Sequence, residues 1–204
     1  MPFSTNGMDE NPLEKQGGYE TEEKMPRESA WKEFLRFALI ALAIVIPFRL
    51  FVAQPFIVSG ASMSPTFETG EYLIVDELTY RFEEPKRGDV IILKKPSGGG
   101  EYLIKRIVGL PGDTVVIKNG AVTVKSKGNP DGEKISEPYV KNKKEENLEI
   151  AVGNNEYFVM GDNRPISLDS RYIGAIPKEN IVGRAWARVL PVKEMALFPG
   201  AVEN

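Results

Sequence analysis

Apolar residues divide the chain into three parts with different patterns. Residues 1–30 are mostly polar and show no apolar period, so we expect a mobile tail. Residues 37–48 form an uncharged apolar run, which is typical of a helix buried in protein or lipid. After residue 53, apolar residues come in short runs separated by turn residues, which predicts β-strands. The pattern therefore predicts a tail, one long apolar segment and a β-rich domain.

The apolar run extends to the window 34–53 if Arg36 and Arg49, which lie near its ends, are tolerated. Arginine side chains at such positions can reach the lipid headgroups, and about 20 helical residues span the roughly 30 Å of hydrocarbon. A buried core helix or a cleavable signal peptide would also fit the run itself, and residues 59–61 resemble a small-x-small cleavage site. The leader would however be unusually long and acidic, with that site far beyond the run. We therefore expect a membrane anchor over residues 31–53.

Basic residues predict the orientation of this anchor. Lys24, Arg27 and Lys32 closely precede the apolar window 34–53, whereas no Lys or Arg occurs between Arg49 and Arg81. Because basic residues favour the cytoplasmic side, we expect a cytoplasmic N-terminus in the inner or plasma membrane. The rest of the chain would then be extracytoplasmic.

The extracytoplasmic part, residues 54–204, is predicted to be mainly β. Asn119-Gly120 separates two apolar runs and is typical of a type I′ hairpin, because both central residues need positive φ. Residues 125–155 are polar and are expected to form a surface excursion. The clearest predicted strand segments are 72–75, 89–93, 102–108, 115–124 and 157–160.

Composition excludes several function classes. The chain has no His and no Cys, which excludes a Ser-His-Asp triad, a Cys-His dyad, disulfides and the usual zinc sites. A catalytic base must then come from Lys, Asp, Glu or Tyr. The net charge is -3 and no basic stripe with interleaved aromatic residues occurs, so we expect no nucleic-acid partner.

A candidate nucleophile lies just after the apolar segment. Residues 59–66 read Ser-Gly-Ala-Ser-Met-Ser-Pro-Thr, which combines small residues, a Pro turn and hydroxyl groups. Small neighbours let a substrate backbone approach, and a turn can expose a hydroxyl beside free backbone N–H groups. A Ser-rich connector between anchor and domain would give a similar pattern, so this segment alone leaves both readings open.

A lysine is the best candidate for the base. Its reference pKa of about 10.4 must be lowered by burial before a neutral amine is available near neutral pH. Alternation along 102–108 places Lys105 and Arg106 on opposite apolar faces, and it does not say which cation is buried. Arg cannot act as a base at accessible pH, which leaves Lys105, although a strand-edge lysine with its amine in water remains the commoner situation.

Four segments follow one another in a fixed order along the chain. They are 59–66, Arg-Gly-Asp-Val at 87–90, Lys-Arg-Ile-Val-Gly-Leu-Pro-Gly-Asp at 105–113, and Gly-Asp-Asn-Arg-Pro-Ile-Ser-Leu-Asp-Ser-Arg at 161–171. Together they resemble bacterial type I signal peptidases, and the resemblance runs from the anchor to about Pro191. It implies coiled antiparallel sheets preceded by one transmembrane helix. It also implies a serine endopeptidase that removes signal peptides from exported preproteins, in contact with membrane lipid and without cofactor or metal.

The resemblance assigns the catalytic roles residue by residue. The nucleophile falls on Ser62 and the general base on Lys105, while Ser167 matches a hydroxyl that hydrogen-bonds the lysine amine. The Ser62 backbone N–H would bind the oxyanion. Many family members add a serine hydroxyl two residues before the nucleophile, where this chain has Gly60, so the second oxyanion donor is in doubt.

The remaining motif residues are expected to support the site. Asp169 and Arg171 match an ion pair that braces it, and Gly161-Asp162 matches a turn near the dyad. A metal or carboxylate-dyad site at Asp162 and Asp169 is disfavoured, because Arg171 and Arg164 are available to neutralise them.

Two rival functions stay open at this level. One is a related Ser/Lys peptidase with another substrate, such as a pilin-maturation or conjugative-transfer peptidase or a self-cleaving repressor. The other is a catalytically inert, membrane-tethered binding module that keeps the fold. The retained Ser62, Lys105 and Ser167 argue against the second rival, and the predicted anchor argues against a soluble repressor.

Overall fold

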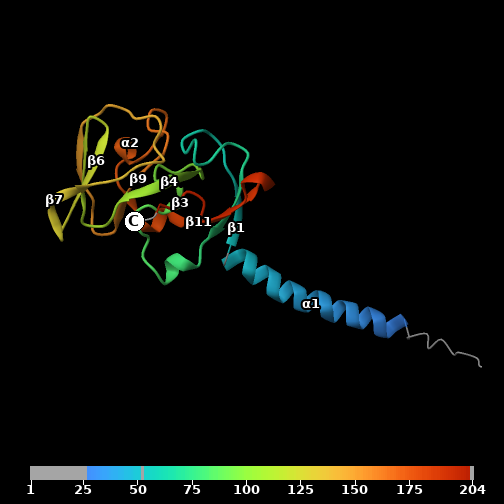
Figure 1. The fold of residues 1–204 in the computed structure, drawn as a ribbon. Coiled ribbons are helices and arrows are strands. Elements are labelled where there is room, and N and C mark those ends of the chain that lie inside the picture. The colour runs from blue at the N-terminus through green and yellow to red at the C-terminus, as the bar shows by residue number, and fades with distance from the viewer. Residues whose placement is uncertain (1–26, 52, 203–204) are drawn as a thin grey trace, which may run out of the picture. The chain divides into compact units, whose positions relative to one another are not determined.

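The computed structural model describes residues 27–51 and 53–202, and the chain divides into two units, residues 1–42 and 43–204. Helix α1 spans Arg27–Phe51 (Figure 1). The predicted tail lies outside the described residues, except for its last four positions, which begin α1. Within the described ranges, no helix meets both the length and the apolarity needed to cross a membrane.

The larger unit is built on an antiparallel sheet of eight strands (Figure 1). Its order is β1-β2-β11-β3-β4-β9-β10, with β12 paired to β11, so β3 and β4 lie in the interior of the sheet. The strands are β1 Ala53–Ile57, β2 Tyr72–Asp76, β3 Val90–Lys94, β4 Tyr102–Gly109, β9 Glu156–Met160, β10 Ile176–Pro177, β11 Ile181–Leu190 and β12 Ala196–Leu197.

A second antiparallel sheet has the order β7-β6-β5-β8. Its strands are β5 Thr114–Lys118, β6 Ala121–Ser126, β7 Asn129–Lys134 and β8 Leu148–Ala151. Short helical turns complete the unit: η1 Thr79–Arg81, α2 Ser170–Ile173, η2 Lys178–Asn180 and η3 Val192–Glu194.

Apolar residues of the two sheets form three buried clusters. In one cluster, Val108 and Phe158 of the first sheet pack with Val115 and Val124 of the second. The other two clusters contain alternate residues of β3, with Ile92 in one and Ile91 in the other. Because β3 has core on both faces, its sequence reads as a continuous apolar run rather than as an alternating one. β4 is also buried on both faces, but its apolar run is interrupted by Lys105 and Arg106.

The predicted strands and hairpin are confirmed. Asn119 and Gly120 have φ of 49° and 73°, as a type I′ turn requires, and they connect β5 to β6. The segment 125–155 contains more structure than its polar sequence indicated, because β7 and β8 lie within it and extend the second sheet. β11 was also not among the predicted strands, although it pairs with both β2 and β3.

Candidate active site

Ser62 lies in the loop between β1 and β2, which is attached to the domain by apolar and polar contacts. The side chains of Met63 and Phe67 are 1% and 0% exposed and anchor the loop in the core. Asn163 holds the loop from the other side, since its backbone N–H donates to the Ser62 carbonyl at 3.0 Å. Its side-chain amide donates to the Ala61 carbonyl at 3.1 Å. The nucleophile candidate therefore sits on a backbone fixed at several points.

Lys105 of β4 is within hydrogen-bonding distance of the candidate nucleophile. Its Nζ donates to Ser62 Oγ at 2.8 Å and to the Ile104 carbonyl at 2.8 Å, and the residue is only 2% exposed. Burial lowers the pKa of the Lys105 amine to about 8, although the negative charges of Asp169 and Asp162 offset part of this shift. A neutral amine is therefore available close to neutral pH.

Arg106, the next residue on β4, is buried as deeply but is differently paired. It is 1% exposed, and its Nε and Nη2 donate to Asp162 at 2.9 Å and 2.6 Å. Its Nη1 donates to the carbonyls of Gly88 and Gly200, and its guanidinium lies 3.9 Å from the centre of the Tyr139 ring. The side-chain pattern left open which cation is buried, and the structure shows that both are.

The pairing of Asp162 differs from the expected one. Arg164, considered available to neutralise this carboxylate, forms a buried ion pair with Glu137 instead. Asp162 is paired with Arg106 and also accepts a hydrogen bond of 2.6 Å from Thr66 Oγ1, on the nucleophile loop. Asp162 thus connects the strand that carries the base to the loop that carries the nucleophile.

Asp169 and Arg171 form the ion pair that the motif suggested. Arg171 Nε donates to Asp169 at 2.8 Å, and both side chains are buried. Asp169 also caps α2 and accepts the Gly161 N–H at 2.9 Å, while Arg171 pairs with Glu146 as well. These contacts fix both ends of the loop from Gly161 to Arg171.

Ser167 lies beside the dyad, but its hydroxyl makes no hydrogen bond within the described part of the chain. The predicted bond to the Lys105 amine is therefore not formed here, where the amine donates to Ser62 and Ile104. A side chain at Gly161 would come within 2.2 Å of Ser167 Oγ and 2.4 Å of the Ser62 carbonyl oxygen. Only glycine fits at that position.

The backbone N–H of Ser62 itself is a free donor. Among the described residues, no acceptor is found for the Ser62 N–H. Gly60 has φ of 89°, and a Cβ atom added there would have nothing within 4 Å. The restriction at this position therefore comes from the backbone conformation and not from lack of space. The Gly60 carbonyl accepts from Thr69 Oγ1 at 3.1 Å, which holds this turn.

A small pocket of about 100 Å³ opens beside the dyad. One side of the pocket is formed by the end of β1 and the residues that follow it. The other side is formed by the first half of β4. Both Ser62 and Lys105 contribute to its wall. The remaining lining residues are mainly apolar: Phe56, Ile57, Val58, Ser59, Leu73, Ile92, Tyr102, Leu103 and Ile104.

No group of His, Cys, Asp or Glu side chains with metal-binding geometry occurs among the described residues. Asp162 and Asp169 each have a guanidinium partner, Arg106 and Arg171. The chemistry that this arrangement supports is proton transfer between a buried amine and a hydroxyl.

The structure adds residues to the site that sequence reasoning did not assign. Thr66 and Asn163 lie inside two of the four motif segments, so their motif positions were a usable signal. Glu137 and Glu146 lie in the segment 125–155 and form ion pairs with the loop from Gly161 to Arg171, here called the site loop. Their polar sequence surroundings did not indicate these pairs.

Comparison with known proteins gives consistent similarities. Residues 31–190 match the family described as signal peptidase, peptidase S26. A probable signal peptidase I-2 of Synechocystis sp. is 33% identical over 185 residues, which cover 88% of this chain and 82% of that protein. A signal peptidase I of Bacillus licheniformis is 35% identical over 188 residues, covering 86% and 97%.

Proposed function

We propose that Ser62 and Lys105 are the catalytic dyad of this chain, which belongs to the signal peptidase family, peptidase S26, and is a serine endopeptidase of the type I class. The observation that carries the proposal is the 2.8 Å contact between Ser62 Oγ and a buried lysine amine whose pKa is lowered to about 8. The substrates are preproteins that carry a signal peptide.

In the proposed mechanism, the neutral Lys105 amine accepts the Ser62 hydroxyl proton as Oγ attacks the scissile carbonyl carbon. The resulting ammonium returns this proton to the leaving amine when the C–N bond breaks, which leaves an ester on Ser62. A water molecule then gives its proton to the neutral amine and attacks the ester. The protonated lysine finally restores the Ser62 hydroxyl as the carboxylate product departs.

Supporting roles follow from the contacts around the dyad. The Asp169–Arg171 pair and Gly161-Asp162 hold the site loop against the nucleophile loop. The Ser167 hydroxyl has no partner among the described residues and lies against Gly161, next to the Ser62 carbonyl. Its proposed role is to accept a hydrogen bond from the lysine once the amine is charged. Its substitution should therefore slow the steps that pass through the ammonium.

The Ser62 N–H is the proposed oxyanion donor, because it lies on the nucleophile and has no acceptor within the described chain. Ser59 lines the same pocket, and its hydroxyl is a candidate for a second donor in place of the one that Gly60 lacks.

The pocket supports a preference for small residues in the substrate. A volume of about 100 Å³ suits one small side chain, and the wall is mainly apolar. Among the described strands, β1 pairs with β2 alone and forms one edge of the sheet, so its free side offers hydrogen bonds to an extended peptide. We therefore expect a substrate that lies as a strand beside the pocket.

The proposal includes an anchor at residues 31–53 in the inner or plasma membrane, with the tail in the cytoplasm and residues 54–204 outside. Large apolar side chains of α1 are exposed on opposite sides of the helix, for example Phe37 at 74% and Leu39 at 61%, and lipid would cover them. Protease added to intact spheroplasts should cut within 125–155 and spare residues 1–30. The reverse pattern would contradict the orientation.

The pH dependence of preprotein cleavage tests the dyad. Because only the neutral amine accepts a proton, kcat/KM should fall about tenfold per pH unit below the Lys105 pKa of about 8. A limb near pH 10, or near the carboxylate range, would contradict a buried lysine base. The Ser62→Ala protein, assayed in the same detergent, gives the background rate.

A further inference from the structure

The last described residues, 198–202, fold back onto the domain as a short strap. They follow β12, which pairs with β11 through Ala187 and Arg188. The Phe198 N–H donates to the Trp186 carbonyl at 2.7 Å, and the Ala201 N–H donates to the Phe198 carbonyl at 3.0 Å. The first bond ties the strap to β11, and the second closes a turn within the strap.

The strap reaches the buried cation next to the proposed base. The Gly200 carbonyl accepts a hydrogen bond from Arg106 Nη1, which shares its donors between this carbonyl and that of Gly88. Gly200 has φ of 77°, and a side chain there would come within 2.7 Å of Thr66 and 3.3 Å of Phe67. The strap therefore touches both Arg106 and the nucleophile loop at one glycine.

These contacts connect the strap to both dyad residues. Arg106 follows Lys105 on β4 and pairs with Asp162. Asp162 in turn accepts from Thr66, which lies on the same loop as Ser62. Without the strap, one Arg106 donor would lose its protein acceptor and water would reach an ion pair that is now 1% exposed. A more hydrated pair holds its two partners less firmly.

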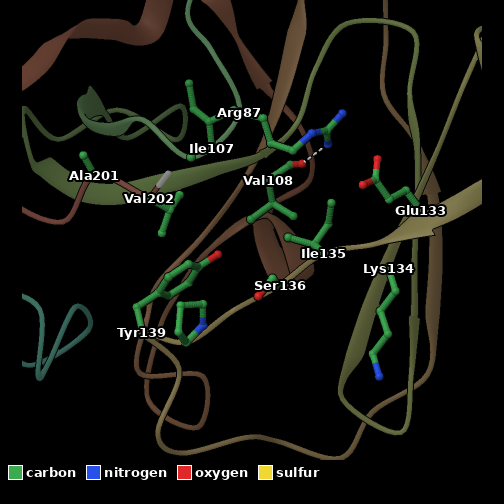
Figure 2. Close-up of a pocket in the computed structure, with 12 residues that line it drawn as sticks. Arg87, Ile107, Val108, Glu133, Lys134, Ile135, Ser136, Tyr139, Ala201 and Val202 are labelled. Atoms are coloured by element: carbon green, nitrogen blue, oxygen red, sulfur yellow. Dashed lines mark hydrogen bonds between the residues drawn. The ribbon is translucent and has the colours of Figure 1, made fainter. Parts of the chain in front are cut away.

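Two cavities flank the strap. Figure 2 shows the larger one, of about 610 Å³, with Ala201 and Val202 on one side and Arg87 and Tyr139 elsewhere on its wall. The second, of about 330 Å³, is also lined by Ala201 and Val202. The strap is held between them by the contact of Gly200 with Arg106 and by the Phe198 ring, whose centre lies 4.8 Å from the Arg184 guanidinium.

We propose that the strap 198–202 is a positioning element of the active site, which fixes the Arg106–Asp162 pair and through it the geometry between Ser62 and Lys105. The proposal rests on the proposed dyad. Displacements of about 1 Å at reacting groups can cost about 100-fold in rate, so the strap should act on kcat more than on substrate binding.

The test compares two truncations of the full chain in detergent. Ending the chain after Leu197 removes the strap, and ending it after Val202 is the matched control. With a preprotein-derived peptide, we expect the first truncation to lower kcat by about 10- to 100-fold with KM within about twofold, and the control to match the full chain. An unchanged kcat in the first truncation would overturn the proposal.

A second pair of variants covers the case in which the truncated chain unfolds. Gly200→Ala introduces a side chain at φ of 77° against Thr66, whereas Gly98→Ala introduces one at φ of 83° with nothing within 4 Å. We expect Gly200→Ala to lower kcat at least about tenfold more than Gly98→Ala at a temperature where thermal melts show both folded. Equal kcat values would overturn the proposal, whereas cleavage by Ser62→Ala would instead overturn the dyad.

Discussion

The two faces of β4 place two buried cations in opposite electrostatic situations. On one face, the Lys105 amine donates hydrogen bonds to a hydroxyl and a carbonyl, beside a small open pocket. On the other, Arg106 is closed in by the strap and donates two hydrogen bonds to the carboxylate of Asp162. Their exposures, 2% and 1%, are nearly equal. Burial alone therefore does not make a base; the difference lies in what surrounds the charge.

The physical reason is the balance between desolvation and pairing. Burial removes water from both side chains, which penalises the charged form. A carboxylate in direct contact compensates Arg106, whereas Asp162 and Asp169 act on Lys105 without a hydrogen bond to its amine. The lysine therefore gives up its proton easily, and the arginine serves as a fixed structural charge.

The largest expected effect is on the rate of preprotein cleavage when Lys105 is substituted. Lys105→Met and Lys105→Arg should each lower preprotein cleavage by at least about 1,000-fold, since one has no amine and the other has a guanidinium that stays protonated. Ser62→Ala should match them, and the double variant should be no slower, because the two residues act as a unit. Purified protein and single-turnover assays would measure this. Turnover near the original rate in a folded Lys105→Arg protein would refute the dyad.

Removing the carboxylate partner of Arg106 should cause the largest loss of stability. Asp162→Asn leaves a buried guanidinium without its carboxylate, which costs about 3–5 kcal/mol in the free energy of unfolding. Denaturant titration measures it, with Glu149→Gln as the control, because Glu149 pairs with Lys125 at the surface. The control should cost less than about 1 kcal/mol. Equal costs for the two substitutions would mean that the buried pair has no special role.

Substituting Lys105 is expected to raise the stability of the protein rather than lower it. Its pKa falls from an ordinary 10.5 to about 8 on folding, so a shift of this size costs roughly 3 kcal/mol while the unfolded chain holds the proton. Below pH 8 this cost is complete, and it disappears as pH rises toward 10.5. Lys105→Met should therefore be more stable than the parent at pH 6, by up to about 3 kcal/mol, and the difference should shrink by pH 10.

Denaturant titrations of both proteins at the two pH values would test this. Comparing the two proteins at each pH cancels the other groups that titrate. A stability difference that does not change with pH would show that the lysine is not forced to lose its proton on folding.

The smallest expected effect concerns Gly60, beside the nucleophile. Its φ of 89° means that any side chain strains the turn by about 1–2 kcal/mol, so Gly60→Ser should lower stability although space is available. Gly60→Ala carries the same strain without a hydroxyl. If the hydroxyl reaches the oxyanion, kcat of Gly60→Ser should exceed that of Gly60→Ala by about tenfold, which is below the effect of a fully formed donor. Equal rates would mean that the oxyanion is already stabilised by other donors.

The sequence alone determined the elements that depend on local patterns. The hairpin at Asn119-Gly120 follows from the backbone that these residues allow, and the main strands follow from their apolar runs. The absence of His reduced the choice of base to a few residue types, and motif resemblance then pointed to Ser62 and Lys105. Each of these inferences needs only neighbouring residues or composition.

Tertiary structure decided which charges meet. Nothing local indicates that Asp162 pairs with Arg106 rather than with Arg164, because that choice depends on the register between β4 and β9. The contact of Gly200 with Arg106 likewise joins positions far apart in the chain. Burial and long-range pairing set the Lys105 pKa and the support of the nucleophile loop, and these quantities exist only once the sheets have assembled.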